Sequence, residues 1–166
     1  LVAAGWQPPQ RITVKARDGV TELHGLLFRP TNFDASKKYP IINHIYPGPQ
    51  TGSVGSRQFA ASRSDTQALA ELGFVVVEID GMGTPWRSKR FHEKYYGDMG
   101  DNTLPDQVAG MKELATRFAE VGVDAVAFDF FARTASTEDR SESFDFMSQV
   151  PLTKPETLQA DIAAAA

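Results

Sequence analysis

Cysteine is absent from the 166 residues of this chain. Its absence excludes a disulfide framework, a thiolate metal site and a cysteine nucleophile. Long apolar runs are absent too, because stretches such as residues 74–77 are far shorter than the ~20 residues of a membrane-spanning helix. We therefore expect no membrane span, and no residue pattern indicates a metal or a cofactor.

Positive charge is also scarce, with 17 Lys and Arg against 21 Asp and Glu and a formal net charge of -4. Without a basic cluster, nucleic acid is not an expected partner. The hydrophobic fraction of 42% and the charged fraction of 23% are typical of one globular domain. The first five residues contain neither a basic region nor an initiator methionine, so we expect further sequence upstream.

Two segments rich in strand-forming residues, 11–16 and 23–28, flank the sequence Arg-Asp-Gly-Val. Asp-Gly between such segments favours a tight turn, which predicts an antiparallel hairpin. After a polar loop, residues 40–46 are predicted to form a buried strand that ends at a Pro-Gly-Pro sequence.

Helical and strand patterns then alternate along the chain. Residues 65–72 favour a short helix that ends at Gly73, and the β-branched residues of 74–80 favour a strand. This pair forms one helix-strand unit of the kind found in α/β folds.

A second helix is predicted over residues 104–118, with Thr103 as its cap and Asp106 at its third position. A further strand is predicted over residues 124–129. The alternation indicates an α/β fold with a mainly parallel sheet, flanking helices on both faces and the N-terminal antiparallel hairpin at its edge.

The loop after the strand at 40–46 carries the first candidate site residue, because ligands of parallel sheets bind beyond the carboxyl ends of the strands. Residues 45–50, Ile-Tyr-Pro-Gly-Pro-Gln, resemble the Tyr-X-Gly-Pro loop of the prolyl oligopeptidase family. In its dipeptidyl-peptidase-like members this tyrosine helps to stabilise the oxyanion, and the resemblance implies that role for Tyr46. Without the resemblance, a tyrosine with its ring in the core and its hydroxyl at the edge is the favoured interpretation of Tyr46.

A second loop resembles the same family. Residues 79–88, Ile-Asp-Gly-Met-Gly-Thr-Pro-Trp-Arg-Ser, are similar to its Asp-X-Arg-Gly-Thr/Ser-Gly stretch, with Met82 in place of the usual arginine. Residues 91–100 and the pair Asp106-Gln107 fit the family's path into the helix before its nucleophile. The resemblance covers residues 6–117 and implies a partial α/β-hydrolase fold and a serine peptidase activity.

The nucleophile of that family lies in a Gly-X-Ser-X-Gly turn, and this pattern does not occur in the chain. Ser53 does not fit the pattern, because Thr51 stands where the first glycine is required. The catalytic histidine of the fold comes late in the domain, whereas His24, His44 and His92 come early. We interpret all three as structural or surface histidines, and we predict that the isolated chain is inactive.

The last part of the chain resembles a different family of the same fold. Residues 118–133 are similar to dienelactone hydrolases around their fourth strand, and residues 159–165 fit the helix before their nucleophile. The resemblance implies that Arg133 contacts a substrate carboxylate, for which a two-pronged donor is suited. From the residues alone, a surface arginine after a strand is the favoured interpretation. Asp80 and Asp129, at the ends of predicted strands, are interpreted as turn-forming residues.

Three interpretations follow. The chain is a portion of a serine hydrolase that acts on peptides, with Tyr46 at the oxyanion; or it is a fragment of an esterase that acts on a small ester, with Arg133 on the substrate; or it is a non-catalytic α/β interaction module. We expect one partial domain over residues 1–166, with a possible junction of two relatives near residue 117. Compartment, oligomeric state and natural or chimeric origin stay open.

Overall fold

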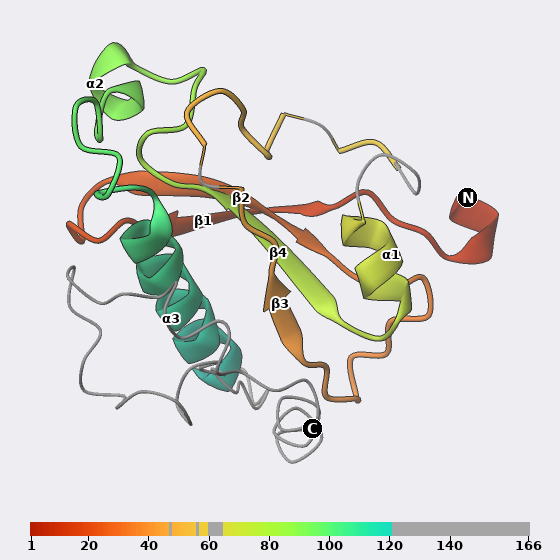
Figure 1. Ribbon diagram of the computed structural model, residues 1–166. Helices are drawn as coiled ribbons and strands as arrows, with labels where there is room; N and C mark the ends of the chain where they lie inside the picture. Colours follow the sequence, from red (N-terminus) through yellow and green to blue (C-terminus); the bar gives the residue numbers. More distant parts are fainter. Residues whose placement is uncertain (47, 56, 60–64, 121–166) are drawn as a thin grey trace, which may run out of the picture. The chain divides into compact units, whose positions relative to one another are not determined.

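A computed structural model describes residues 1–46, 48–55, 57–59 and 65–120 (Figure 1). The strand predicted at 124–129, Asp129, Arg133 and the helix predicted at 159–165 lie outside these residues. No helix in the described part is long and apolar enough to span a membrane. The described elements, in chain order, are the 3-10 helix η1 (Val2–Ala4), β1 (Gln10–Lys15), β2 (Glu22–Phe28), β3 (Ile41–Asn43), α1 (Thr66–Glu71), β4 (Val75–Asp80), α2 (Lys89–His92) and α3 (Leu104–Glu120).

The predicted hairpin is confirmed, because β1 and β2 pair antiparallel from Lys15 opposite Glu22 onward. Asp18 holds the turn, since its carboxylate accepts hydrogen bonds from the backbone N–H groups of Val20 at 2.9 Å and Thr21 at 2.8 Å. Gly19 has a φ of 70° in the same turn, a conformation that glycine adopts without strain.

The sheet has the strand order β1-β2-β4-β3. Strands β3 and β4 are parallel, with Ile41 opposite Val75, as predicted. Strand β2 lies directly beside β4 and runs antiparallel to it, with His24 opposite Asp80. The prediction of a mainly parallel sheet is therefore wrong for the described residues, because the hairpin contributes two antiparallel pairings and only β3-β4 is parallel.

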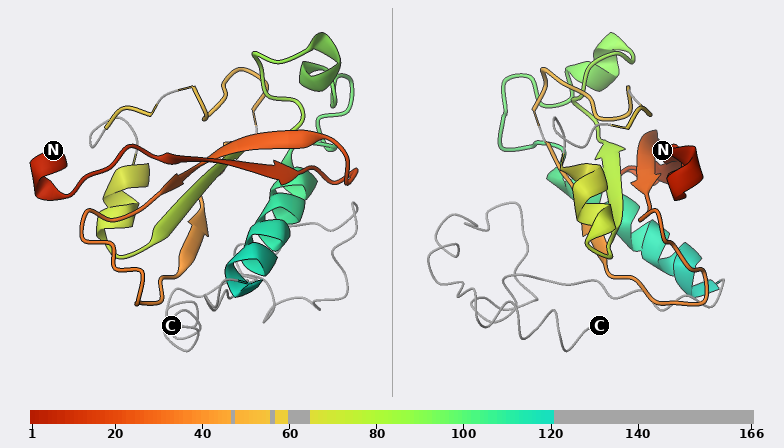
Figure 2. Two further views of the ribbon diagram at one scale, coloured as in Figure 1. Left: turned by 180° about the vertical axis from the view of Figure 1, so that it is seen from behind. Right: turned by 90° about the vertical axis from the view of Figure 1, so that its right-hand side faces the viewer.

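Helices α1 and α3 cover opposite faces of this sheet (Figure 2). Alternate side chains of β4 point to opposite faces. Val76 belongs to a small apolar cluster with Ala70 of α1, whereas Val77 belongs to the larger cluster with Leu114 of α3. The flanking helices and the edge position of the hairpin agree with the sequence-based prediction.

Helix α3 begins at Leu104, but the predicted capping by Thr103 is wrong. The Thr103 hydroxyl is buried without a hydrogen-bond partner, and the Asn102 side chain accepts from the Leu104 N–H instead, at 2.8 Å. Asp106 points inward, is fully buried, and accepts from Arg17 Nε at 3.0 Å. The Asp106 carboxylate therefore bonds to Arg17, which is distant in sequence, and does not form the capping box at the start of α3.

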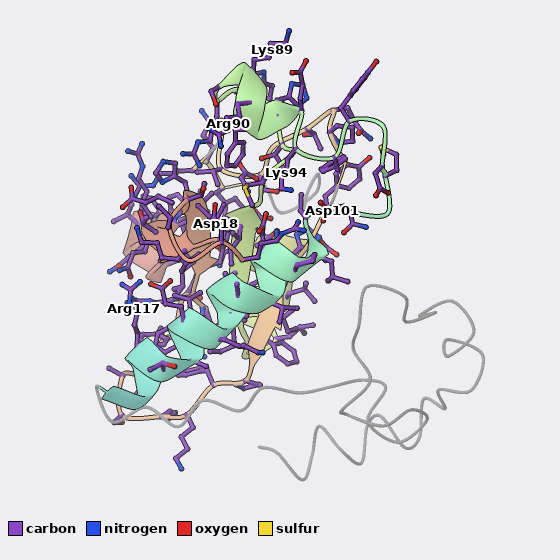
Figure 3. The ribbon with its side chains drawn as sticks, turned by 90° about the vertical axis from the view of Figure 1, so that its left-hand side faces the viewer. Asp18, Lys89, Arg90, Lys94, Asp101 and Arg117 are labelled. Carbon is purple, nitrogen blue, oxygen red and sulfur yellow. The ribbon has the colours of Figure 1, made fainter. Side chains whose placement is uncertain are left out.

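A chain of charged groups continues from Arg17 to the surface. The Arg17 guanidinium also pairs with Asp101, and Lys94 donates to Asp101 at 3.2 Å. Figure 3 shows Lys94 and Asp101 beside the start of α3. Burial acts to raise the pKa of Asp101, but the hydrogen bonds from Arg17 and Lys94 outweigh it and hold this pKa below its usual value. The network fastens α3 to the turn that follows β1.

Candidate active site

The carboxyl ends of β3 and β4 lie at the same edge of the sheet, because the two strands are parallel. The His44 N–H donates to the Val77 carbonyl at 2.8 Å and extends the pairing by one residue beyond β3. Tyr46 follows two residues later, and its side chain is 53% exposed. Tyr46 is therefore not a core residue.

The Tyr46 hydroxyl oxygen accepts a hydrogen bond from Gln50 Nε2 at 2.6 Å. A tyrosine hydroxyl can accept and donate at the same time. Gln50 occupies the accepting side, so the hydroxyl hydrogen is available for a negatively charged oxygen. Donation from Gln50 also polarises the O–H bond and strengthens its donation.

The loop that carries Tyr46 is tied to the end of β4 by Asp80. The Asp80 carboxylate accepts from the backbone N–H groups of Ser53 at 2.6 Å and Val54 at 3.1 Å. The His92 ring donates from Nε2 to the Pro49 carbonyl at 2.9 Å. Asp80, expected to form a turn, therefore joins two loops that are far apart in sequence, and His92 supports the same loop.

The second loop of the family resemblance is packed tightly. Gly83 has a φ of 107°, and a Cβ there would lie 1.7 Å from the Tyr95 ring. Met82 is buried, and its N–H donates to Asp106 Oδ2 at 2.8 Å. Burial raises the pKa of Tyr95. Glycine at position 83 is thus required by a positive φ and by the close approach of an aromatic ring.

His44 has partners at both ring nitrogens. Nδ1 lies 3.0 Å from Glu78 Oε1, and Nε2 lies 3.2 Å from Asp65 Oδ1. The Thr66 hydroxyl donates to Glu78 at 2.7 Å, so that the buried carboxylate of β4 is joined to the first residue of α1. These contacts fit the interpretation of His44 as a structural residue.

Among the predicted site residues, the structure describes Tyr46 alone, since Arg133 lies outside the described part. The Tyr46 side chain bonds to Gln50 of its own loop. Within the described residues, no cluster of three metal-ligating side chains occurs. The roles of Asp80 and Gln50 were missed. A Gln four residues after the tyrosine was visible in the sequence, whereas the Asp80 contact spans 26 to 27 residues and had no local signal.

The strand order β1-β2-β4-β3, the helices on opposite faces and a candidate loop beyond the parallel pair are the features of an α/β-hydrolase segment. Residues 59–127 match the model of the prolyl oligopeptidase family. The resemblance of the front part of the chain to this family is therefore confirmed.

Individual relatives agree with that assignment. The chain is 35% identical over 121 residues to dipeptidyl peptidase 8 of Homo sapiens, a match that covers 73% of this chain and 13% of the human protein. It is 37% identical over 105 residues to a dipeptidyl-aminopeptidase B of Podospora anserina, covering 63% of this chain and 11% of that protein.

A solved structure gives the same result. A Bacteroides ovatus protein described as a dipeptidyl aminopeptidase IV superposes with a TM-score of 0.55 and 33% identity, over 68% of this chain and 16% of that one. The chain thus spans less than a fifth of the length of these relatives. None of these matches shows the resemblance of residues 118–166 to dienelactone hydrolases.

Proposed function

We propose that this chain is a portion of a serine peptidase that removes dipeptides from peptide N-termini. Tyr46 donates a hydrogen bond to the oxyanion, and the nucleophile and its base come from sequence that this chain does not contain. The observation that carries the proposal is the hydroxyl of the exposed residue Tyr46 beyond β3, which accepts a hydrogen bond from Gln50 and keeps its own hydrogen to donate.

Three further features support the proposal. The Tyr46 loop is held by Asp80 and His92, so the phenol starts from a restrained backbone and loses little entropy when it binds a developing charge. The relatives are named as dipeptidyl peptidases or dipeptidyl aminopeptidases. The esterase alternative depends on Arg133, which lies outside the described residues, and no described contact favours it.

The proposal is tested in a fusion in which residues 6–117 replace the matched segment of the Bacteroides ovatus protein. We expect Tyr46→Phe to lower kcat for a Gly-Pro anilide by roughly 10²-fold or more, because loss of one oxyanion donor costs about 3 kcal/mol in the transition state. The melting temperature of the fusion should stay nearly constant, because the lost hydroxyl lies on an exposed side chain.

The matched control is Tyr96→Phe, which removes a hydroxyl from a tyrosine that is 89% exposed. Gln50→Glu is a second variant, since a carboxylate accepts the Tyr46 hydrogen and withdraws it from the oxyanion. We expect it to lower kcat, while Gln50→Ala has a smaller effect. An unchanged kcat in the Tyr46→Phe fusion would contradict the oxyanion role. A lower kcat accompanied by a clear fall in melting temperature would contradict it too, because the lost hydroxyl would then serve packing.

A further inference from the structure

A groove of about 470 Å³ lies at the end of the sheet away from Tyr46. It is bordered by the N-terminal segment, by the paired residues Gln10 and Leu27, and by the loop after β2. At the other end of β2, His24 pairs with Asp80 of the candidate active site. Figure 1 shows the N-terminal segment well separated from α2, which contributes His92 to that site. The two sites are therefore distinct.

Three arginines line the groove, and no Asp or Glu is among its described lining residues. The arginines are Arg11, Arg29 and Arg57. A carboxylate in the vicinity, that of Glu71, is engaged by Thr31 Oγ1 at 2.9 Å and by Gln67 Nε2 at 2.7 Å. This concentration of positive charge contrasts with the net charge of -4 for the whole chain.

Neighbouring groups restrain two of these arginines. The Arg29 guanidinium lies 4.8 Å from the centre of the Phe33 ring, and it also donates to the Gln10 side chain. Arg57 Nε donates to the Pro9 carbonyl at 2.8 Å. Both guanidinium groups keep further N–H donors, since each has five. Held in this way, they lose less side-chain entropy on binding a ligand.

We propose that this groove binds a small molecule that carries a diphosphate group. Guanidinium groups pair with phosphate oxygens through two parallel hydrogen bonds, and two linked phosphates offer enough oxygens for three arginines. The volume is that of a small-molecule site. The inference does not depend on the peptidase proposal, because Tyr46, Gln50, Asp80 and His92 are not among the described residues that line the groove. Of those lining residues, Arg57 is the one from the connection between β3 and α1, which also carries Tyr46.

The test is a calorimetric titration of the intact chain with inorganic pyrophosphate at constant ionic strength. We expect saturable binding to one site. Arg11→Gln and Arg29→Gln should each raise Kd at least about tenfold, because each removes a charge-assisted, two-pronged contact. Arg29→Lys keeps the positive charge but loses the planar pair of N–H donors, so an intermediate Kd is expected.

Arg90→Gln is the matched control, because Arg90 is an exposed arginine on α2 (Figure 3). Its Kd should equal that of the unchanged chain. Absence of saturation, or an equal effect of Arg90→Gln, would overturn the proposal and indicate general charge screening. Tighter binding of tricarballylate, a tricarboxylate, would overturn the assignment to phosphate. Circular dichroism of each variant shows whether a lost signal reflects unfolding.

Discussion

The Asp18 carboxylate accepts three hydrogen bonds, from the Thr21 hydroxyl at 2.5 Å and from the Thr21 and Val20 N–H groups. These bonds, with the Thr21 hydroxyl first, lower the pKa of Asp18 to about 2 from its usual 3.8. The charge of this residue therefore stabilises the hairpin turn through hydrogen bonds from Thr21 and Val20.

Asp18 gives a prediction for acid stability. Its pKa is lower in the folded chain than in the unfolded chain, so its contribution is complete above about pH 4 and is lost as the pH falls toward 2. Asp18→Asn cannot titrate, and we expect its free energy of unfolding to fall less than that of the unchanged chain over this window. Urea unfolding between pH 5 and pH 2 measures the difference. If the free energies of unfolding of the two chains changed in parallel with pH, the protonation of Asp18 would have no effect on folding stability.

Individual site residues were predictable only where a short motif marked them. Tyr46 was proposed because its loop has a recognisable sequence, and its exposed position is compatible with the proposed role. The Asp80 contacts with Ser53 and Val54 were not predictable, because they form only when two separate loops meet in the folded chain. Every residue except proline has a backbone N–H, so the sequence does not show which of these groups will donate to Asp80.

Secondary-structure elements were more predictable than their ends. Hydrophobic alternation and Asp-Gly located the hairpin, and β-branched residues located β4. Strand β3 is shorter than predicted, ending at Asn43, although His44 still bonds to β4. The capping prediction for α3 failed because Asp106 is used by Arg17, a residue 89 positions away. Local signals cannot reveal such competition.

The docking of α3 depends on that buried contact, which leads to a prediction for Asp106→Ala. The Asp106 side chain is fully buried and that of Arg17 is 20% exposed. Loss of the carboxylate leaves Arg17 with Asp101 as its remaining ion-pair partner and leaves the buried Met82 N–H without its acceptor. We expect the free energy of unfolding to fall by about 3–5 kcal/mol. Urea denaturation of the intact chain, followed by circular dichroism, measures this change.

The matched control is Asp98→Ala, since Asp98 is exposed and its carboxylate accepts a hydrogen bond from the Gly100 N–H at 3.0 Å. Its cost should be about 1 kcal/mol or less. Arg17→Met combined with Asp106→Leu should recover part of the lost stability, because apolar groups of similar size can replace a buried ion pair. A loss below about 1 kcal/mol for Asp106→Ala would mean that apolar packing alone holds α3.

At the scale of the molecule, the α/β class and the hydrolase relationship could be inferred from the sequence, but strand directions could not be inferred fully. The hairpin was correctly placed at the sheet edge, yet β2 lies directly against β4 and makes the described sheet mixed. Hydrophobic patterning specifies which face of a strand is buried, and it does not specify the neighbour or its direction. The motif loops nevertheless lie where the resemblance implied, next to the ends of β3 and β4.

The most direct test of the central claim compares the isolated chain with the fusion that carries residues 6–117. Both are treated with a fluorophosphonate probe and assayed with a Gly-Pro anilide. We expect no labelled serine and no hydrolysis in the isolated chain, because the Gly-X-Ser-X-Gly pattern that activates the family's serine does not occur in its sequence. The fusion should be labelled at one serine and should hydrolyse the anilide. Fold-dependent labelling of the isolated chain, or a folded and labelled fusion without hydrolysis, would contradict the account.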